Sequence, residues 1–344
     1  MRRDRGRPAG SGSPLLRAIL LLAGWILPAG AAAQERAPSP EALVERAARE
    51  ARPGERAALA RAALKTLARR GEESPLLEAR AWLLLGDFPE ALRALERFPL
   101  PPGGSLPRQA RPLFRQALEG LVKEGKASQA LPLLLRLYRK LRPRPRWLPS
   151  LLVRAWPARQ GKEEVPPELV VQAGREALEA GERDPAFLRA YFQILVGLDL
   201  SGRPEAALPG FRALARAFPR EKWTALSLAV VLRHLGRYRQ AAEVLHRAAK
   251  LHPHDPALPT DEGLCWKCLG RMDRAEACFR RAMAAAPPRK TRDPRISLGL
   301  LLLDRGRRRE AQEVLRPTLD LDPPQPYAWL LWVRSAFCRG KRGF

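Results

Sequence analysis

Apolar residues recur along most of this chain at the three- and four-residue spacing of a helix that is buried on one side. In the second half, Ile194 and Leu198 belong to one such stripe, and Leu228 and Leu232 belong to the next. This spacing places the side chains on a single helical face. β-Branched residues are few, and runs that alternate apolar and polar residues are absent. The pattern therefore predicts an all-α chain.

Regularly spaced residues punctuate these stripes. Gly202, Gly236, Gly270 and Gly306 recur at intervals of 34, 34 and 36 residues. Glycine accepts the left-handed backbone that ends a helix, alanine lets two helices approach closely, and proline ends a second helix. Each glycine is followed at fixed spacing by an alanine, a large apolar residue and a proline: Ala207, Phe211 and Pro219; Ala241, Leu245 and Pro253; Ala275, Phe279 and Pro287; Ala311, Leu315 and Pro323.

This punctuation resembles the tetratricopeptide repeat, a helix–turn–helix unit with a period near 34 residues. The resemblance implies an all-α fold, a right-handed superhelical solenoid of antiparallel helix pairs. It predicts a repeat array over residues 188–344 that follows divergent hairpins over residues 34–187. Within the array, the repeats lie near residues 188–221, 222–255, 256–291 and 292–325, with a terminal helix near 326–340.

The divergent part carries weaker copies of the same pattern. Trp82, Gly86, Ala91 and Leu95 match the columns of one repeat, and the residues around Gly125 match those of another. The predicted helix pairs are 41–52 with 55–70, broken by Pro53 and Gly54, then 76–85 with 89–98, a pair on either side of Gly125, and 147–156 with 168–180.

Some residues depart from the repeat pattern. Pro259 and Glu262 occupy columns that usually hold large apolar residues, so we expect that helix to start late. Pro209 and Pro317 fall inside second helices. Each removes a backbone donor, so we expect a bend or a shortened helix. Two extra residues near 287–292 predict a looser turn.

The first 33 residues have the pattern of an export signal. Arginines precede an apolar run from Ala18 to Leu27, and small residues follow it up to Ala33. This order predicts a secretory signal peptide that is cleaved after Ala33, with Ala31 as the second choice. The apolar run is shorter than the roughly 20 residues of a membrane span. An uncleaved membrane anchor and an organelle transit peptide are the alternatives.

The net charge of +26 comes mainly from arginine, which is spread over most of the predicted helices. Arginine is a strong helix former, and its stem covers apolar surface, so helical composition accounts for much of this charge. The functional interpretation is attraction to an anionic partner such as an acidic protein, a lipid headgroup or a wall polymer. Nucleic acid is not expected, because it conflicts with export.

Four cysteines and four histidines offer little metal chemistry. Cys265 and Cys268 form a C-x-x-C pair inside a predicted helix, without the strand of a redox motif or a second ligand pair for zinc. Packing is the simpler interpretation, and a Cys265–Cys278 disulfide is the alternative in an oxidising compartment. His252 and His254 share a linker that is more typical of solvent than of a metal site.

No pattern of an enzyme is present. The chain has no glycine-rich phosphate loop, no G-x-S-x-G and no H-E-x-x-H. His234 and His246 lie on predicted helices with no carboxylate at an obvious spacing. The sequence therefore predicts no catalytic residue, cofactor or metal.

The resemblance also implies a binding groove, because the first helices of such repeats line a concave face. An extended or helical peptide with acidic groups would fit the predicted mixture of aromatic, apolar and basic residues. The paired Lys and Asn clamp of chaperone-binding relatives is not expected, since the chain has no Asn. For the apolar members, packing between repeats is the alternative. The main candidates are Arg189, Phe192, Trp223, Arg233, His234, Lys267, Tyr327, Arg334 and Phe337, and the inward positions between them are Val196, Asp199, Leu226, Val230, Thr260, Leu264, Cys268, Ile296, Leu300 and Leu330.

The sequence thus favours a non-catalytic exported scaffold that binds a protein or peptide in the assembly of an envelope or secreted complex. One alternative is a peripheral binder of anionic membrane or cell-wall polymer that acts by charge. Another is an accessory subunit of an enzyme complex whose catalytic chain lies elsewhere.

Overall fold

The computed structural model describes residues 38–100, 104–158, 166–285, 293–319 and 330–334. All regular elements in these ranges are helices, which confirms the all-α prediction. The predicted leader, the turn near 287–292, Pro323, Tyr327 and Phe337 lie outside the described residues.

The chain divides into two compact units, residues 1–94 and 95–344, and each is described by itself. In the first unit, Leu43 and Val44 pack with Ala63 and Ala81 in a small buried cluster. Its helices are α2 (Pro40–Arg49), α3 (Pro53–Arg70), α4 (Pro75–Leu85) and most of α5 (Phe88–Glu96).

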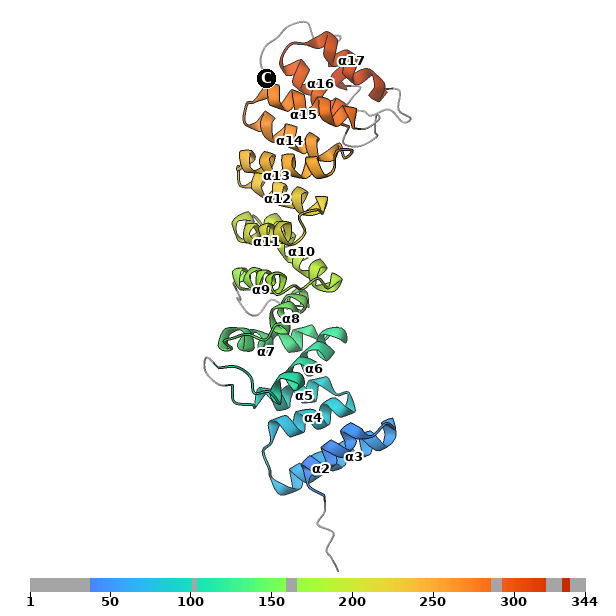
Figure 1. Cartoon of the computed structure of the whole chain (residues 1–344), viewed down its shortest axis with the longest axis vertical. Coiled ribbons are helices and arrows are strands. Elements are labelled where there is room, and N and C mark those ends of the chain that lie inside the picture. The colour runs from blue at the N-terminus through green and yellow to red at the C-terminus, as the bar shows by residue number, and fades with distance from the viewer. Residues whose placement is uncertain (1–37, 101–103, 159–165, 286–292, 320–329, 335–344) are drawn as a thin grey trace, which may run out of the picture. The chain divides into compact units, whose positions relative to one another are not determined.

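The second unit is a series of helices in which each packs against its neighbours along the chain (Figure 1). From α10 onward, the helices form pairs joined by short turns. The unit contains α6 (Ala110–Lys123), α7 (Ala127–Lys140), α8 (Trp147–Ala155), a 3-10 turn (Trp156–Ala158), α9 (Pro167–Glu179), α10 (Pro185–Leu200), α11 (Pro204–Ala217), α12 (Lys222–His234), α13 (Tyr238–Leu251), α14 (Ala257–Cys268), α15 (Met272–Ala284), α16 (Pro294–Asp304) and α17 (Arg308–Leu319).

The repeating columns of the sequence build the core of these pairs. In each of the four array pairs, the second helix buries an alanine and the large apolar residue four positions later. These residues are Ala207 and Phe211, Ala241 and Leu245, Ala275 and Phe279, and Ala311 and Leu315. In two pairs, the first helix carries a glycine opposite the large residue of the second helix. A Cβ atom on Gly263 would lie 2.6 Å from a ring carbon of Phe279, and a Cβ atom on Gly299 would lie 2.7 Å from Leu315. Size complementarity therefore sets the approach of the two helices.

The turn after each first helix requires glycine. Gly236 has a φ of +69°, which is the left-handed region that disfavours other residues. Its N–H donates to the carbonyl of Arg233 at 2.9 Å, and the N–H of Arg237 donates to Leu232 at 2.8 Å. These bonds satisfy the last carbonyl groups of α12 and turn the chain back into α13.

Three expectations about prolines are wrong in detail. Helix α14 begins at Ala257, so it does not start late; Pro259 lies in the first turn, where a missing N–H costs nothing. Pro53 begins α3, so it is not part of a break between helices. Helix α11 continues through Pro209 to Ala217, so of the two expected effects of this proline the shortening does not occur.

Candidate functional site

The first helices of the repeats bury one side and leave the other side accessible. Leu228, Leu232, Leu298 and Leu302 lie on the buried side. We call the accessible side the first-helix face. Every described residue that the sequence predicts for the groove on α10, α12, α14 and α16 is half-buried or exposed: Arg189, Phe192, Val196 and Asp199; Trp223, Leu226, Val230, Arg233 and His234; Thr260, Leu264, Lys267 and Cys268; Ile296 and Leu300.

Aromatic rings connect the first two helices of this face. The rings of Phe192 on α10 and Trp223 on α12 lie 5.6 Å apart, edge to face. Phe192 also packs edge to face on buried Phe211, and Trp223 lies 6.2 Å from Phe218. Both candidate aromatic residues thus contribute to packing between repeats while they keep part of their surface accessible.

Two of the predicted basic residues lie beside carboxylates of other repeats. His234 Nδ1 lies 2.8 Å from Asp199 Oδ1, and Lys267 Nζ lies 3.1 Å from Asp304 Oδ2. The expectation that His234 has no nearby carboxylate is therefore wrong. Its partner lies 35 residues earlier, one repeat away, so the repeat interval is the signal that could have found it.

Two arginines of the first-helix face keep an uncompensated charge. Arg189 on α10 is exposed and Arg233 on α12 is half-buried, and neither makes an ion pair with any described residue. Arg334 is also exposed, in the short described segment 330–334. The face therefore offers guanidinium groups beside accessible apolar side chains such as Val230, which is 39% exposed.

A buried carboxylate lies behind this face. Glu262 on α14 is only 3% exposed, in a column that is apolar in the neighbouring repeats. One oxygen lies 3.1 Å from His246 Nδ1 on α13 and accepts from Trp266 Nε1 at 3.4 Å; the other accepts from Arg281 on α15. The expectation that His246 has no carboxylate partner is thus also wrong. The partners make this burial tolerable, because an unpaired buried carboxylate is very costly.

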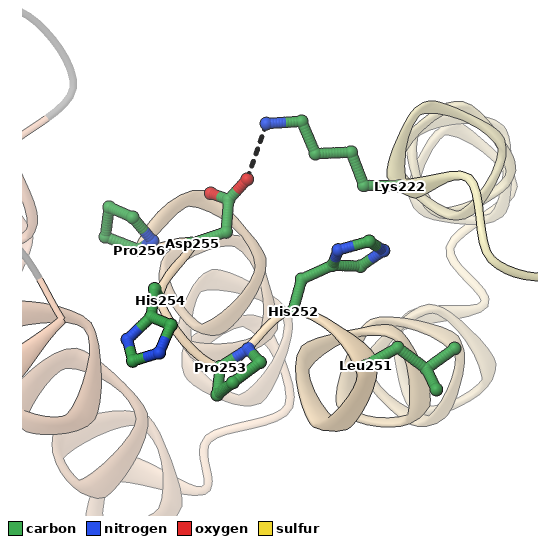
Figure 2. A pocket seen from close by; sticks show the side chains of 7 residues that line it. All are labelled: Lys222, Leu251, His252, Pro253, His254, Asp255 and Pro256. Carbon is green, nitrogen blue, oxygen red and sulfur yellow. Dashed lines mark hydrogen bonds and ion pairs between the residues drawn. The ribbon is translucent and has the colours of Figure 1, made fainter.

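The linker between α13 and α14 borders a pocket of about 460 Å³ (Figure 2). Its two imidazoles point away from each other, on either side of Pro253. His252 Nε2 lies 2.8 Å from the carbonyl oxygen of Arg220, and Asp255 pairs with Lys222 at 2.6 Å. Asp255 also accepts from the N–H of Ala257 at the start of α14. These residues connect two repeats rather than converge on a metal.

The cysteines of the described part are free thiols; Cys265 and Cys278 are buried, and Cys268 is exposed. Burial raises the pKa of Cys265 to about 11 and the pKa of Cys278 to about 12. Neutral, buried thiols act as small apolar residues. Within the described ranges, no group of three or more His, Cys, Asp or Glu residues could hold a metal ion. Over the same ranges, no helix is both long and apolar enough to cross a bilayer.

Comparison with known families matches the repeat pattern. One model of the tetratricopeptide repeat matches residues 201–256 and 226–290, and a second matches residues 76–97 and 293–317. Tetratricopeptide repeat protein 17 of Danio rerio is 30% identical over 83 residues. The matched segment is 24% of this chain and only 7% of that protein.

The solved structures that match this chain are distant in sequence. The C-terminal part of a TPR repeat-containing protein from Cytophaga hutchinsonii has a TM-score of 0.45 and 13% identity, over 74% of this chain and 98% of that one. MamA from Desulfovibrio magneticus RS-1, from residue 41 to its end, has a TM-score of 0.39 and 17% identity, over 53% of this chain and 97% of that one. Together with the family matches, the helix pairs identify an all-helical, tetratricopeptide-like repeat fold.

Proposed function

We propose that this tetratricopeptide-repeat protein is a non-catalytic scaffold that binds a protein or peptide through its first-helix face. Repeats of this kind generally mediate contacts between proteins. We further propose that the partner contributes an acidic segment. The complex forms after export, in an envelope or secreted assembly.

The charge balance of the face carries the proposal about the partner. His234 and Lys267 already have carboxylate partners, whereas Arg189 and Arg233 have none among the described residues. A carboxylate of the partner would supply the missing counter-ion. The accessible surface of Phe192 and Trp223 would contact apolar side chains of the same segment, since aromatic and arginine residues dominate the energetics of many interfaces.

Export is supported by the leader pattern alone. Arginines, an apolar run and small residues up to Ala33 precede the described helices. We expect the mature protein to begin at Gln34. N-terminal sequencing of protein recovered from its native cells checks this, and an intact Met1 on a cytosolic protein would contradict it.

Cross-linking and pull-down from the native envelope would identify the partner, and binding would then be measured with purified variants. We expect Arg233→Glu to weaken binding by at least about tenfold, because it turns attraction of a carboxylate into repulsion. Arg216→Glu on α11 is the matched control, since Arg216 is exposed and makes no ion pair with a described residue. Equal binding by both variants would exclude the first-helix face as the site.

A further inference from the structure

The turns between first and second helices carry a repeated arginine. From the second array repeat onward, the residue after each turn glycine is Arg237, Arg271 or Arg307, and further arginines follow it in the sequence. We call the residues 235–239, 269–274 and 305–309 the turn edge. The turn between α10 and α11 is not included, because its Arg203 pairs with Glu168 and is followed by Glu205.

Contacts between repeats bring these turns to the same edge of the second unit. Lys267 and Asp304 join the C-terminal ends of α14 and α16. Arg305, after α16, pairs with Asp273 at the start of α15 at 2.7 Å. Helix α13, which begins at the turn after α12, packs against α14, which ends at the next turn. The three turns are therefore neighbours in space although they are about one repeat apart in sequence.

The carboxylates of the turn edge and its surroundings are already compensated. Arg305 engages Asp273 and Glu276, and Arg307 engages Glu276 and Glu310. Burial alone would raise the pKa of Glu276, but hydrogen bonds from Arg280 and Arg307 outweigh it and lower that pKa. Glu276 thus stays ionised and keeps its arginines.

Five arginines of the turn edge make no ion pair with a described residue, and one of them, Arg274, lies over the ring of Trp266. Of the other four, Arg237, Arg271 and Arg309 are exposed, and Arg308 is half-buried. Other exposed basic residues without an ion pair in the described part lie elsewhere on the second unit, such as Arg216, Arg220, Arg247 and Lys250. The turn edge differs because it groups such arginines on three neighbouring turns.

Apolar exposure distinguishes between anionic partners. Leu269, in the turn after α14, is 38% exposed and stands two residues before Arg271. Arginine next to an exposed leucine suits a lipid interface, where the charge meets headgroups and the apolar side chain enters the boundary below them. Nucleic-acid strands are usually bound with exposed aromatic rings for stacking, and the described residues include no exposed aromatic side chain.

We propose that the turn edge binds the phosphate headgroups of an anionic bilayer as a peripheral surface, with Arg237, Arg271, Arg308 and Arg309 as the contacts. Leu269 reaches into the headgroup boundary. The turn edge shares no residue with the first-helix face, and this proposal does not depend on the peptide-binding proposal. A protein attached through its turns would keep that face available to a partner.

The test is flotation of the purified protein with phosphatidylcholine vesicles that contain or lack phosphatidylglycerol. The variant Arg237→Glu with Arg271→Glu is compared with Arg216→Glu with Arg247→Glu, which reverses the same number of exposed, unpaired arginines on α11 and α13. We expect the wild type to bind only the anionic vesicles. The turn-edge variant should lose at least about tenfold in affinity, because each arginine near such a surface contributes about fivefold and two are replaced. The control should stay within about twofold.

Three results would overturn the proposal. Equal losses in both variants would show that net charge alone, and not the turn edge, drives attachment. Retained vesicle binding by the turn-edge variant would exclude Arg237 and Arg271 as contacts with the headgroups. Binding of short duplex DNA or of an acidic peptide by the wild type, with no binding of vesicles, would assign the edge to another polyanion. Circular dichroism checks that the variants stay helical, and Leu269→Ser, with all charges intact, should reduce vesicle binding only severalfold.

Discussion

Two adjacent helix pairs, α12–α13 and α14–α15, fill the same column of the repeat in opposite ways. Leu228 on α12 is 6% exposed and apolar, whereas Glu262 on α14 is 3% exposed and charged. The carboxylate is tolerated because His246 from the preceding pair and Arg281 from its own second helix contact it. The comparison teaches that one backbone accepts either residue, provided that the surrounding side chains are chosen with it.

Exchanging the two residues should give the largest effect. Leu228→Glu buries a carboxylate beside the columns of His246 and Arg281, which here hold Arg212 and Arg247. Both arginines are exposed and would have to turn inward to pair with it, so we expect a loss of about 3 kcal/mol. Glu262→Leu should cost less than about 1 kcal/mol, because buried ion pairs are often replaced by apolar residues without loss. Arg281 and His246 are 46% and 43% exposed and would return to water. Urea unfolding measures the stability of both variants. Similar losses in the two would refute the explanation that the surrounding side chains decide which residue the column accepts.

The next effect concerns the size exchange between first and second helices. The α14–α15 pair combines Gly263 with Phe279, whereas the same columns in α12–α13 hold Ala229 and Leu245. Gly263→Ala should destabilise by about 1–3 kcal/mol, because the new methyl group would lie 2.6 Å from the Phe279 ring. Adding Phe279→Leu should recover part of that loss. A double-mutant cycle measures the coupling, and strictly additive losses would contradict it.

The smallest effect depends on pH. Cys265 and Cys278 stand where α12–α13 has Val231 and Val244. Burial raises their pKa values to about 11 and 12, above the ordinary value of 9.0. The folded state therefore keeps the two thiol protons to a higher pH than the unfolded state does. The free energy of unfolding is thus unaffected below about pH 9 and falls as the pH rises toward 11. We expect a loss of about 1 kcal/mol for the two thiols together at pH 10, after allowance for solvent screening.

Unfolding at pH 7 to 10 in the presence of a reductant would test this dependence. Cys265→Val with Cys278→Val reproduces the columns of α12–α13 and should flatten the fall in stability between about pH 9 and 10. An unchanged slope in that variant would assign the dependence to other groups.

The fold was readable from the sequence because it depends on local spacing. Glycine at the turns, alanine at the close contacts and large apolar residues opposite them each have a direct physical reason and recur at one interval. The accessible side of the first helices followed from the same columns. Whether these residues bind a partner stays a prediction.

The electrostatic details could not be read in the same way. Asp199 and His234 are a full repeat apart, and Glu262 draws its partners from two other helices. Nothing in the local sequence marks such pairs. Arginine is also evenly spread along the sequence, but the stacked turns bring Arg237, Arg271 and Arg309 to one edge. Other arginines are neutralised by ion pairs with carboxylates.

Glu262 has a consequence for how such a chain can grow and diversify. Units that obey the common pattern can be duplicated or shuffled, because each accepts any similar neighbour. The unit that carries Glu262 brings Arg281 with it but depends on the unit before it for His246. Arg212 and Arg280 stand in the column of His246 at two other junctions, so a transposed copy would meet a basic residue there as well. This carboxylate therefore requires a basic residue in the preceding module, but not one particular module.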